Sequence, residues 1–158
     1  MLELGVGGGD RIRHFAERTS RTLWGFDWFM GLPEDWDQHD RIGTFSTFGE
    51  VPRLPDNCRV IAGLIQLTLP QFLLRHKEPV AFVHFDLDLY SATSFALMML
   101  KDRFAHGAIV MFDEMVGRSR NYAHEGKAFC EFLAATNHAA EFLGQMHGES
   151  MIFKLLTS

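Results

Sequence analysis

Acidic and glycine residues stand where the apolar runs of this chain end, and their spacing suggests two kinds of chemistry. The first run ends in residues 3–10, ELGVGGGD, a glycine turn that leads into a helical pattern. Glycine permits tight turns and close approach of a ligand to the backbone, and the helix that follows offers unpaired N–H groups. The turn therefore predicts a site for a nucleotide-type cofactor.

The spacing of the glycines distinguishes between cofactors. A dinucleotide turn, G-x-G-x-x-G, would place its third glycine where this chain has Asp10. Gly5, Gly7 and Gly9 instead follow G-x-G-x-G, and an acid, Glu3, precedes them, as in S-adenosylmethionine sites. We predict that Glu3 and the three glycines bind S-adenosylmethionine. The alternative, a purely structural turn, stays open.

A second carboxylate supports the cofactor site. Asp27 follows the next apolar run, at the position from which an acid reaches ribose hydroxyls in nucleotide-binding α/β folds. We expect Asp27 to bind the cofactor together with Trp28, whose ring could stack on adenine, and Gly63, which ends the third run. Trp36 could stack in the same way, whereas Phe29 is more typical of a core residue.

Two further apolar runs, typical of buried parallel strands, end in Asp86 and Asp113. Because parallel strands end at one edge of a sheet, Asp86 should approach Asp113 and Glu114 there. Clustered carboxylates repel each other, and neither motif contains Lys or Arg. A hard divalent cation bound by these three carboxylates is the simplest solution, with Mg²⁺ favoured over Mn²⁺ or Ca²⁺. The alternative, that an acid only caps a helix, is favoured for Asp88, which shares this face only if the strand continues.

The catalytic candidates are Asp86 and His39. Asp86 would act through the bound cation, which lowers the pKa of an acceptor hydroxyl. His39 lies in the loop after the second run, and the near-neutral pKa of histidine suits a general base. His84 falls on the buried strand before Asp86, where it could orient a carboxylate.

Apolar runs alternate with helical patterns, which favours a parallel α/β sheet. We predict one Rossmann-like domain over residues 1–158, with seven mostly parallel strands, a C-terminal antiparallel hairpin and helices on both faces. Residues 31–57, rich in Gly, Pro and Asp, form a long loop expected to bind substrate. The first strand is expected to end at Gly5, and the others are expected at 22–26, 59–63, 80–86, 108–113, 141–146 and 151–156. The helices are expected to start at Asp10 as N-cap, at Pro70, at Ser91 and before Ala128.

Composition and charge limit the classes of protein to which this chain can belong. The net charge of −5, with no basic run, argues against nucleic-acid binding and favours a small-molecule substrate. Cys58 and Cys130 lack C-x-x-C spacing and fit reduced thiols in the cytoplasm. We expect no signal peptide, and the sequence contains no apolar run long enough to span a membrane. Because a strand starts at once, we expect internal loops or a second subunit of a homo-oligomer to cover the cofactor.

Five segments together resemble one known family: the glycine turn, GFD with GLP at 25–33, TLP at 68–70, HFDLDLYSAT at 84–93, and FDE at 112–114. They are similar to the macrocin O-methyltransferase (TylF-like) family of class I S-adenosylmethionine-dependent methyltransferases. The resemblance implies methyl transfer to a hydroxyl of a sugar or natural-product intermediate. It also implies that Asp86, Asp113 and Glu114 hold Mg²⁺.

The chain departs from that family at two positions. Glu114 replaces the usual second aspartate, a conservative change for a metal ligand, and Leu67 replaces an acid, which could alter the cofactor pocket. Two other functions remain open. One is a glycosyltransferase that uses Asp86 and Asp88 to bind a metal and a sugar nucleotide, and the other is a relative that binds the cofactor without turnover.

Overall fold

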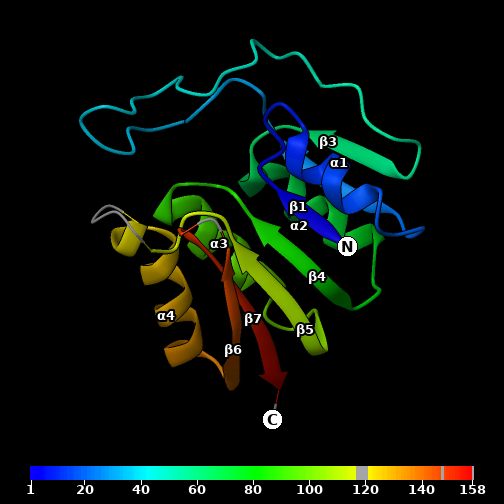
Figure 1. Ribbon diagram of the computed structural model, residues 1–158, viewed down its shortest axis with the longest axis vertical. Coiled ribbons are helices and arrows are strands. Elements are labelled where there is room, and N and C mark those ends of the chain that lie inside the picture. The colour runs from blue at the N-terminus through cyan, green and yellow to red at the C-terminus, as the bar shows by residue number, and fades with distance from the viewer. Residues whose placement is uncertain (117–120, 147, 158) are drawn as a thin grey trace.

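The seven strands form one sheet in the order β3-β2-β1-β4-β5-β7-β6 (Figure 1). The computed structural model describes residues 1–116, 121–146 and 148–157. β1 to β5 are parallel, and β7 and β6 add an antiparallel hairpin, as predicted. The strands are β1 (Leu2–Leu4), β2 (Leu23–Asp27), β3 (Cys58–Ala62), β4 (Val80–Phe85), β5 (Phe104–Phe112), β6 (His138–Met146) and β7 (Ser150–Thr157). The α-helices are α1 (Asp10–Ala16), α2 (Ile65–Arg75), α3 (Tyr90–Leu100) and α4 (Glu125–Ala135), and a 3₁₀ turn covers Asn121–Ala123.

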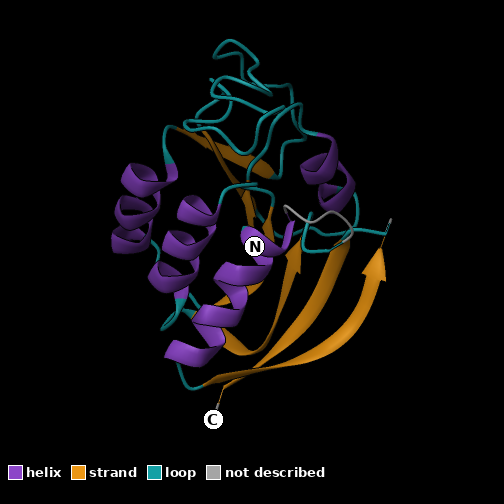
Figure 2. Ribbon diagram, turned by 90° about the vertical axis from the view of Figure 1, so that its left-hand side faces the viewer, coloured by secondary structure: helices purple, strands orange, loops and turns teal. Residues whose placement is uncertain are grey.

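Helices cover both faces of the sheet, unequally. α2, α3 and α4 pack on one face and α1 on the other (Figure 2). Side chains alternate between the faces, so Phe112 contacts Phe129 of α4, with ring centroids 4.8 Å apart, whereas Phe82 contacts Phe15 of α1 at 5.1 Å. Within the described ranges, no helix is both long and apolar enough to cross a membrane.

The parallel register brings the ends of β1, β2 and β4 together. Leu4 pairs with Phe26 on one side and with Phe85 on the other. Gly5 follows with φ of 92°, and a Cβ there would lie 1.8 Å from the backbone oxygen of Asp86. Only glycine fits this close approach, which sets the glycine turn directly beside Asp86.

The structure corrects two predicted helix starts. Gly9, in the left-handed conformation, is the N-cap of α1, and Asp10 is its first residue. α2 begins at Ile65, before the expected start at Pro70, which lies inside the helix. Proline usually lies in the first turn of a helix. Here the first turn forms earlier, because the carbonyl of Leu64 accepts hydrogen bonds from the N–H groups of Leu67 and Thr68, at 2.9 and 3.0 Å.

Residues 28–57 form a long segment without helix or strand, which includes the loop expected over 31–57 (Figure 1). Leu32 and Trp36 anchor it, each 5% exposed and part of the main hydrophobic core. The Ser91 hydroxyl of α3 donates a 2.5 Å hydrogen bond to Glu34 of the same segment. Trp36 is therefore a core residue rather than a stacking platform, and Phe29, 2% exposed, is a core residue as predicted.

Candidate active site

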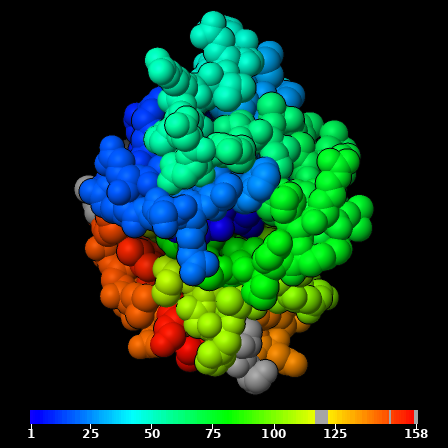
Figure 3. All heavy atoms as spheres, turned by 90° about the vertical axis from the view of Figure 1, so that its right-hand side faces the viewer, coloured from blue at the N-terminus to red at the C-terminus, as the bar shows by residue number. Residues whose placement is uncertain are grey.

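A cavity of about 570 Å³ lies at the edge where the parallel strands end. In Figure 3 the dark-blue N-terminal residues lie at the bottom of a hollow between segment 28–57 and the green residues that follow β4. Its lining includes several residues that the sequence singled out, namely Gly5, Gly7, Asp27, Trp28, Gly63, Asp86, Asp88 and Glu114. Residues from five segments of the chain therefore share one site, as expected for a sheet of this kind.

Other predicted site residues, including the predicted metal ligand Asp113, are not part of the cavity lining. Glu3 is fully buried below the glycine turn, and Gly9 serves the turn itself, since a Cβ there would lie 2.9 Å from Leu54. His39 is exposed in segment 28–57, where its ring lies 3.2 Å from the Gln38 amide. Leu67, the position that departs from the family pattern, is 64% exposed and also lies outside the lining.

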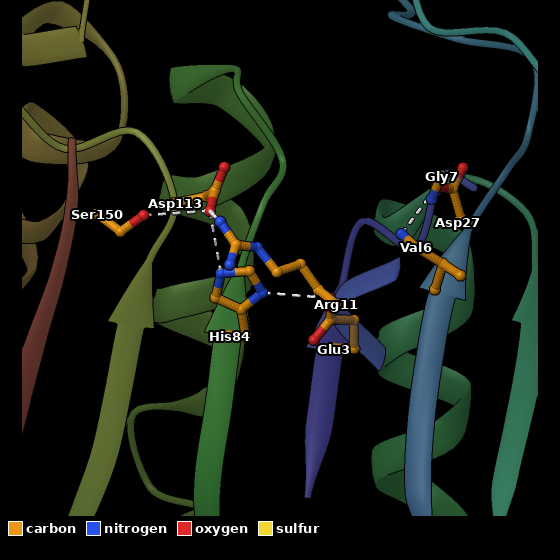
Figure 4. Close-up of polar contacts among 8 residues, drawn as sticks. All are labelled: Glu3, Val6, Gly7, Arg11, Asp27, His84, Asp113 and Ser150. Atoms are coloured by element: carbon orange, nitrogen blue, oxygen red, sulfur yellow. Dashed lines mark hydrogen bonds and ion pairs between the residues drawn. The ribbon is translucent and has the colours of Figure 1, made fainter. Parts of the chain in front are cut away.

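Asp27 ties the glycine turn to the end of β2. Its Oδ2 accepts hydrogen bonds from the N–H groups of Val6 and Gly7, at 2.9 and 2.7 Å (Figure 4). Its Oδ1 accepts another from the N–H of Phe29 at 2.7 Å. A carboxylate offers about four acceptor sites, so Asp27 keeps roughly one for a ligand while it shapes the turn.

The cavity wall near Asp27 is open to a ligand. Apart from the chain neighbours, no heavy atom of the described residues lies within 4 Å of a Cβ placed at Gly7 or Gly8, so a ligand can contact the backbone there. The Trp28 indole N–H donates to the carbonyl of Gly31, which holds the ring at the cavity wall. Gly63 has φ of 139°, which a residue with a Cβ rarely adopts, and its N–H donates to the carbonyl of Asp27 at 2.9 Å.

Three carboxylates, Asp86, Asp88 and Glu114, line the opposite side. Burial raises the pKa of Asp86 well above its usual range, and the nearby charge of Asp113 raises it further. Asp88 does not continue the alternation of β4, because the strand ends at Phe85 and Asp88 has φ of 60°. It still reaches the cavity, through the turn rather than through the strand.

A buried chain of charges runs beneath these carboxylates. Glu3 and His84 are paired neighbours on β1 and β4, and Glu3 Oε1 lies 3.2 Å from His84 Nδ1. His84 Nε2 lies 3.7 Å from Asp113 Oδ1, an ion pair rather than a hydrogen bond. Burial lowers the pKa of His84, but Asp113 and Glu3 outweigh it and raise the pKa to about 10. His84 is therefore a cation at neutral pH, in the orienting position that the sequence suggested.

Asp113 contacts a second positively charged side chain, which the motifs did not indicate. Arg11 of α1 reaches across β1 and β4, and its Nη2 lies 3.0 Å from Asp113 Oδ1 (Figure 4). The Ser150 hydroxyl donates to the same oxygen at 3.2 Å. Burial raises the pKa of Asp113, but His84, Arg11 and Ser150 together lower it below its usual range. The inference from a lack of Lys and Arg in the two motifs was incomplete, since the positive charges come from elsewhere in the fold.

Glu125 is another site residue without a sequence signal. It is 1% exposed at the start of α4, and its Oε2 accepts a hydrogen bond from the N–H of Glu114 at 3.0 Å. Burial raises the pKa of Glu125 well above its usual range, and the charge of Asp86 adds to the effect. An acid in a first helical turn normally suggests a solvated residue, so its burial beside the cavity could not be foreseen.

The carboxylate and imidazole side chains near the cavity carry the donor atoms that could hold a metal ion. Among described residues, Glu3, His84 and Asp86 bring donor atoms within 4.8 Å of one another, and the predicted set with Asp113 and Glu114 does not. Both ring nitrogens of His84 face carboxylates, Nδ1 toward Glu3 at 3.2 Å and Nε2 toward Asp113 at 3.7 Å, so the ring is placed as a donor between two acids rather than as a metal ligand. The three carboxylates offer the oxygen ligands that a hard cation prefers. Burial raises the pKa of Asp86, and the charges of Asp113 and Asp88, which a cation would offset, raise it further.

Comparison with known proteins agrees with this architecture. The profile of the macrocin-O-methyltransferase (TylF) family matches residues 3–135. The comparison with curated proteins gave no match. Among solved structures, CalS11, a calicheamicin methyltransferase, has a TM-score of 0.79 at 22% identity, covering 98% of this chain and 71% of CalS11.

Two other structures resemble the chain. The O-methyltransferase NovP has a TM-score of 0.73 at 21% identity, covering 100% of this chain and 72% of NovP. An O-methyltransferase from Bacillus cereus, solved with S-adenosylhomocysteine, has a TM-score of 0.66 at 18% identity, covering 99% of this chain and 73% of its own. At these identities the structural matches establish the fold, and the family match covers most of the chain.

Proposed function

Because this chain belongs to the macrocin-O-methyltransferase (TylF) family of S-adenosylmethionine-dependent O-methyltransferases, we propose that its cavity holds the cofactor and a sugar hydroxyl side by side. The observation that carries this proposal is the single cavity between the glycine turn with Asp27 and the carboxylates after β4 and β5. One side suits a nucleoside and the other suits a polar acceptor.

The cofactor half consists of the turn and Asp27. The open backbone at Gly7 admits the cofactor, Asp27 reaches a ribose hydroxyl, and Trp28 lies at the wall where adenine would stack. Gly5 and Gly63 bound this half through the backbone. Glu3 supports the site indirectly, from beneath the turn. Its contact with His84 links β1, which leads into the turn, to β4, which leads to the acidic half of the cavity.

In the acceptor half the protein positions a hydroxyl for attack on the methyl group. A divalent cation, Mg²⁺ by preference, held by Asp86, Asp113 and Glu114 would lower the pKa of that hydroxyl. We assign proton removal to Asp88, which lines the cavity, rather than to His39, which is exposed outside it. Methyl transfer also requires that the acceptor oxygen, the methyl carbon and the cofactor sulfur lie in line, and the two halves of the cavity would provide this alignment.

The proposed acceptor is a sugar or a sugar-bearing natural product. CalS11 is described as a TDP-rhamnose 3′-O-methyltransferase of calicheamicin biosynthesis. Because this chain belongs to a family of O-methyltransferases with the same fold, we propose a similar sugar acceptor for it. The charge of the cavity favours an acceptor whose reacting end is an uncharged sugar hydroxyl. Among the residues that the structure describes, its lining contains the acids Asp10, Asp27, Asp86, Asp88 and Glu114 and one basic residue, Arg11.

The test is methyl transfer from S-adenosylmethionine to a panel of neutral glycosides and sugar nucleotides, after exhaustive chelation and again with added Mg²⁺. We expect transfer that Mg²⁺ restores in the wild type and not in Asp86→Asn or Asp113→Asn. Asp102→Asn, an exposed carboxylate in the turn after α3, is the matched control. Transfer that survives chelation would remove the cation from the mechanism, and hydrolysis or transfer of a sugar nucleotide would favour the glycosyltransferase.

A further inference from the structure

Arg11 is the one basic side chain that the described residues contribute to the cavity lining. It follows the last glycine of the turn, Gly9, by two positions, and its side chain is 34% exposed. A guanidinium offers five N–H donors. Among the described residues it has one hydrogen-bond acceptor, Asp113, whose Oδ1 lies 3.0 Å from Arg11 Nη2 (Figure 4). The other donors are therefore available to a ligand in the cavity.

The contact with Asp113 anchors the arginine without using up its donors. Asp113 Oδ1 also accepts a hydrogen bond from the Ser150 hydroxyl at 3.2 Å and lies 3.7 Å from His84 Nε2. Because these partners come from β7 and β4, Asp113 is held in place for the long arginine side chain to reach. A guanidinium that is already ordered loses less side-chain entropy when it binds an anion.

The strand order places Arg11 on the path of the cofactor. In the proposed function the ribose lies at Asp27, at the end of β2, and the acidic half lies after β4 and β5. The strands follow in the order β2-β1-β4-β5, so a cofactor that extends from Asp27 toward the acidic half crosses the end of β1. The Arg11 side chain crosses the same place, between Asp27 and Asp113 (Figure 4).

The charges of the cofactor match those of the lining. S-adenosylmethionine carries a positive sulfonium and a positive ammonium group, and its single negative group is a carboxylate. Five acids of the lining suit the positive groups, and Arg11 suits the carboxylate. A carboxylate can accept two parallel N–H groups from one guanidinium, so such a contact fixes orientation as well as affinity.

We propose that Arg11 binds the carboxylate in the amino-acid part of S-adenosylmethionine. The inference rests on the proposed function and adds a cofactor-binding residue to it. A phosphate of a sugar nucleotide acceptor carries charge of the same sign. It would enter from the acidic half, however, where Asp86, Asp88 and Glu114 repel it.

The test uses ligands that share the adenosine part and differ in the carboxylate. They are S-adenosylhomocysteine, its decarboxylated analogue, and methylthioadenosine, which lacks the amino-acid part. In titration calorimetry, Arg11→Gln should raise the Kd for S-adenosylhomocysteine about tenfold, because a charge-assisted hydrogen bond is lost. The Kd values for the two ligands without a carboxylate should stay unchanged. Arg11→Lys should recover part of the affinity, since it keeps the charge but not the planar fork.

Arg13→Gln is the matched control on the same helix. Arg13 is 37% exposed, and its Nη1 also lies 3.0 Å from a carboxylate, that of Asp10, but Arg13 is not part of the cavity lining. This variant should bind all three ligands as the wild type does.

Equal weakening of all three ligands by Arg11→Gln would show that the arginine only supports the fold, and unchanged binding of S-adenosylhomocysteine would overturn the proposal as well. If that binding is unchanged while KM rises for a sugar nucleotide and not for a neutral glycoside, Arg11 binds an acceptor phosphate instead. Failure of the proposed function is distinguishable, because the wild type would then bind neither S-adenosylhomocysteine nor methylthioadenosine.

Discussion

Gly5 and Gly7 lie in the same turn but are needed for different reasons. Gly5 lets the end of β1 approach the Asp86 backbone, whereas Gly7 leaves space that a ligand can use. Both have positive φ, 92° and 48°, so backbone strain alone does not separate them. What separates them is what a new Cβ would meet, and this difference can be measured.

Gly5→Ala should destabilise the fold by about 3 kcal/mol or more, because its Cβ would overlap the Asp86 oxygen in addition to the left-handed backbone. Gly7→Ala should cost about 1–2 kcal/mol, the backbone strain alone. Its main effect should be weaker cofactor binding. Urea unfolding and calorimetry with S-adenosylhomocysteine measure the two effects. Equal stability of the two variants would contradict this assignment.

At the scale of elements, the pairing of β1 with β4 creates the buried Glu3–His84 contact. His84 has a pKa of about 10 in the folded protein, raised from 6.5. A raised pKa adds stability that is fully present below the unfolded value and is lost as pH rises through the folded value. The window of loss therefore runs from about pH 6.5 to about pH 10.

The wild type should lose unfolding free energy across this window, and His84→Gln should lose much less, since it has no proton to release. Urea unfolding at pH 6.5, 8 and 10 measures the slopes, and His14→Gln, exposed on α1, is the control. A slope in His84→Gln as steep as in the wild type would show that another group titrates. The lowered pKa of Asp113 acts oppositely, because its stabilisation is lost as pH falls through the acidic range.

Strand ends could be predicted from the sequence, and long-range contacts could not. Apolar runs that stop at Gly5, Asp27 and Asp86 mark parallel strands, and parallel strands must end at one edge, so their residues meet at one cavity. Arg11 and Asp113 are 102 residues apart, and the reach of an arginine across two strands leaves no local pattern. The same holds for Glu125 beneath Glu114, since a sequence gives the turn in which an acid lies but not its burial.

At the scale of the whole molecule, segment 28–57 exposes large apolar side chains. Phe48 is 88% exposed, Ile42 68% and Phe45 58%, and Phe45 also lines the cavity. Exposed apolar groups of this size often mark an interface. We therefore keep the prediction that another protomer covers this segment in a homo-oligomer.

Light scattering across a dilution series, with methyl transfer measured on the same samples, tests this prediction. We expect activity to fall as the oligomer dissociates, and Phe48→Ser to shift dissociation to higher protein concentration. Leu74→Ser, which changes a 72% exposed side chain on α2 outside the segment, is the control. A strict monomer with full activity at nanomolar concentration would contradict a shared site.

The central claim is that the cavity beside the glycine turn binds S-adenosylmethionine, and titration calorimetry with S-adenosylhomocysteine tests it most directly. The account predicts micromolar binding by the wild type, little heat with NAD, and a large loss of affinity in Asp27→Ala. That variant removes the proposed ribose contact, two hydrogen bonds to the glycine turn and one to the N–H of Phe29. Asp102→Ala, exposed after α3, should bind as the wild type does. Tighter binding of NAD or of a sugar nucleotide, or unchanged binding by Asp27→Ala, would contradict the account.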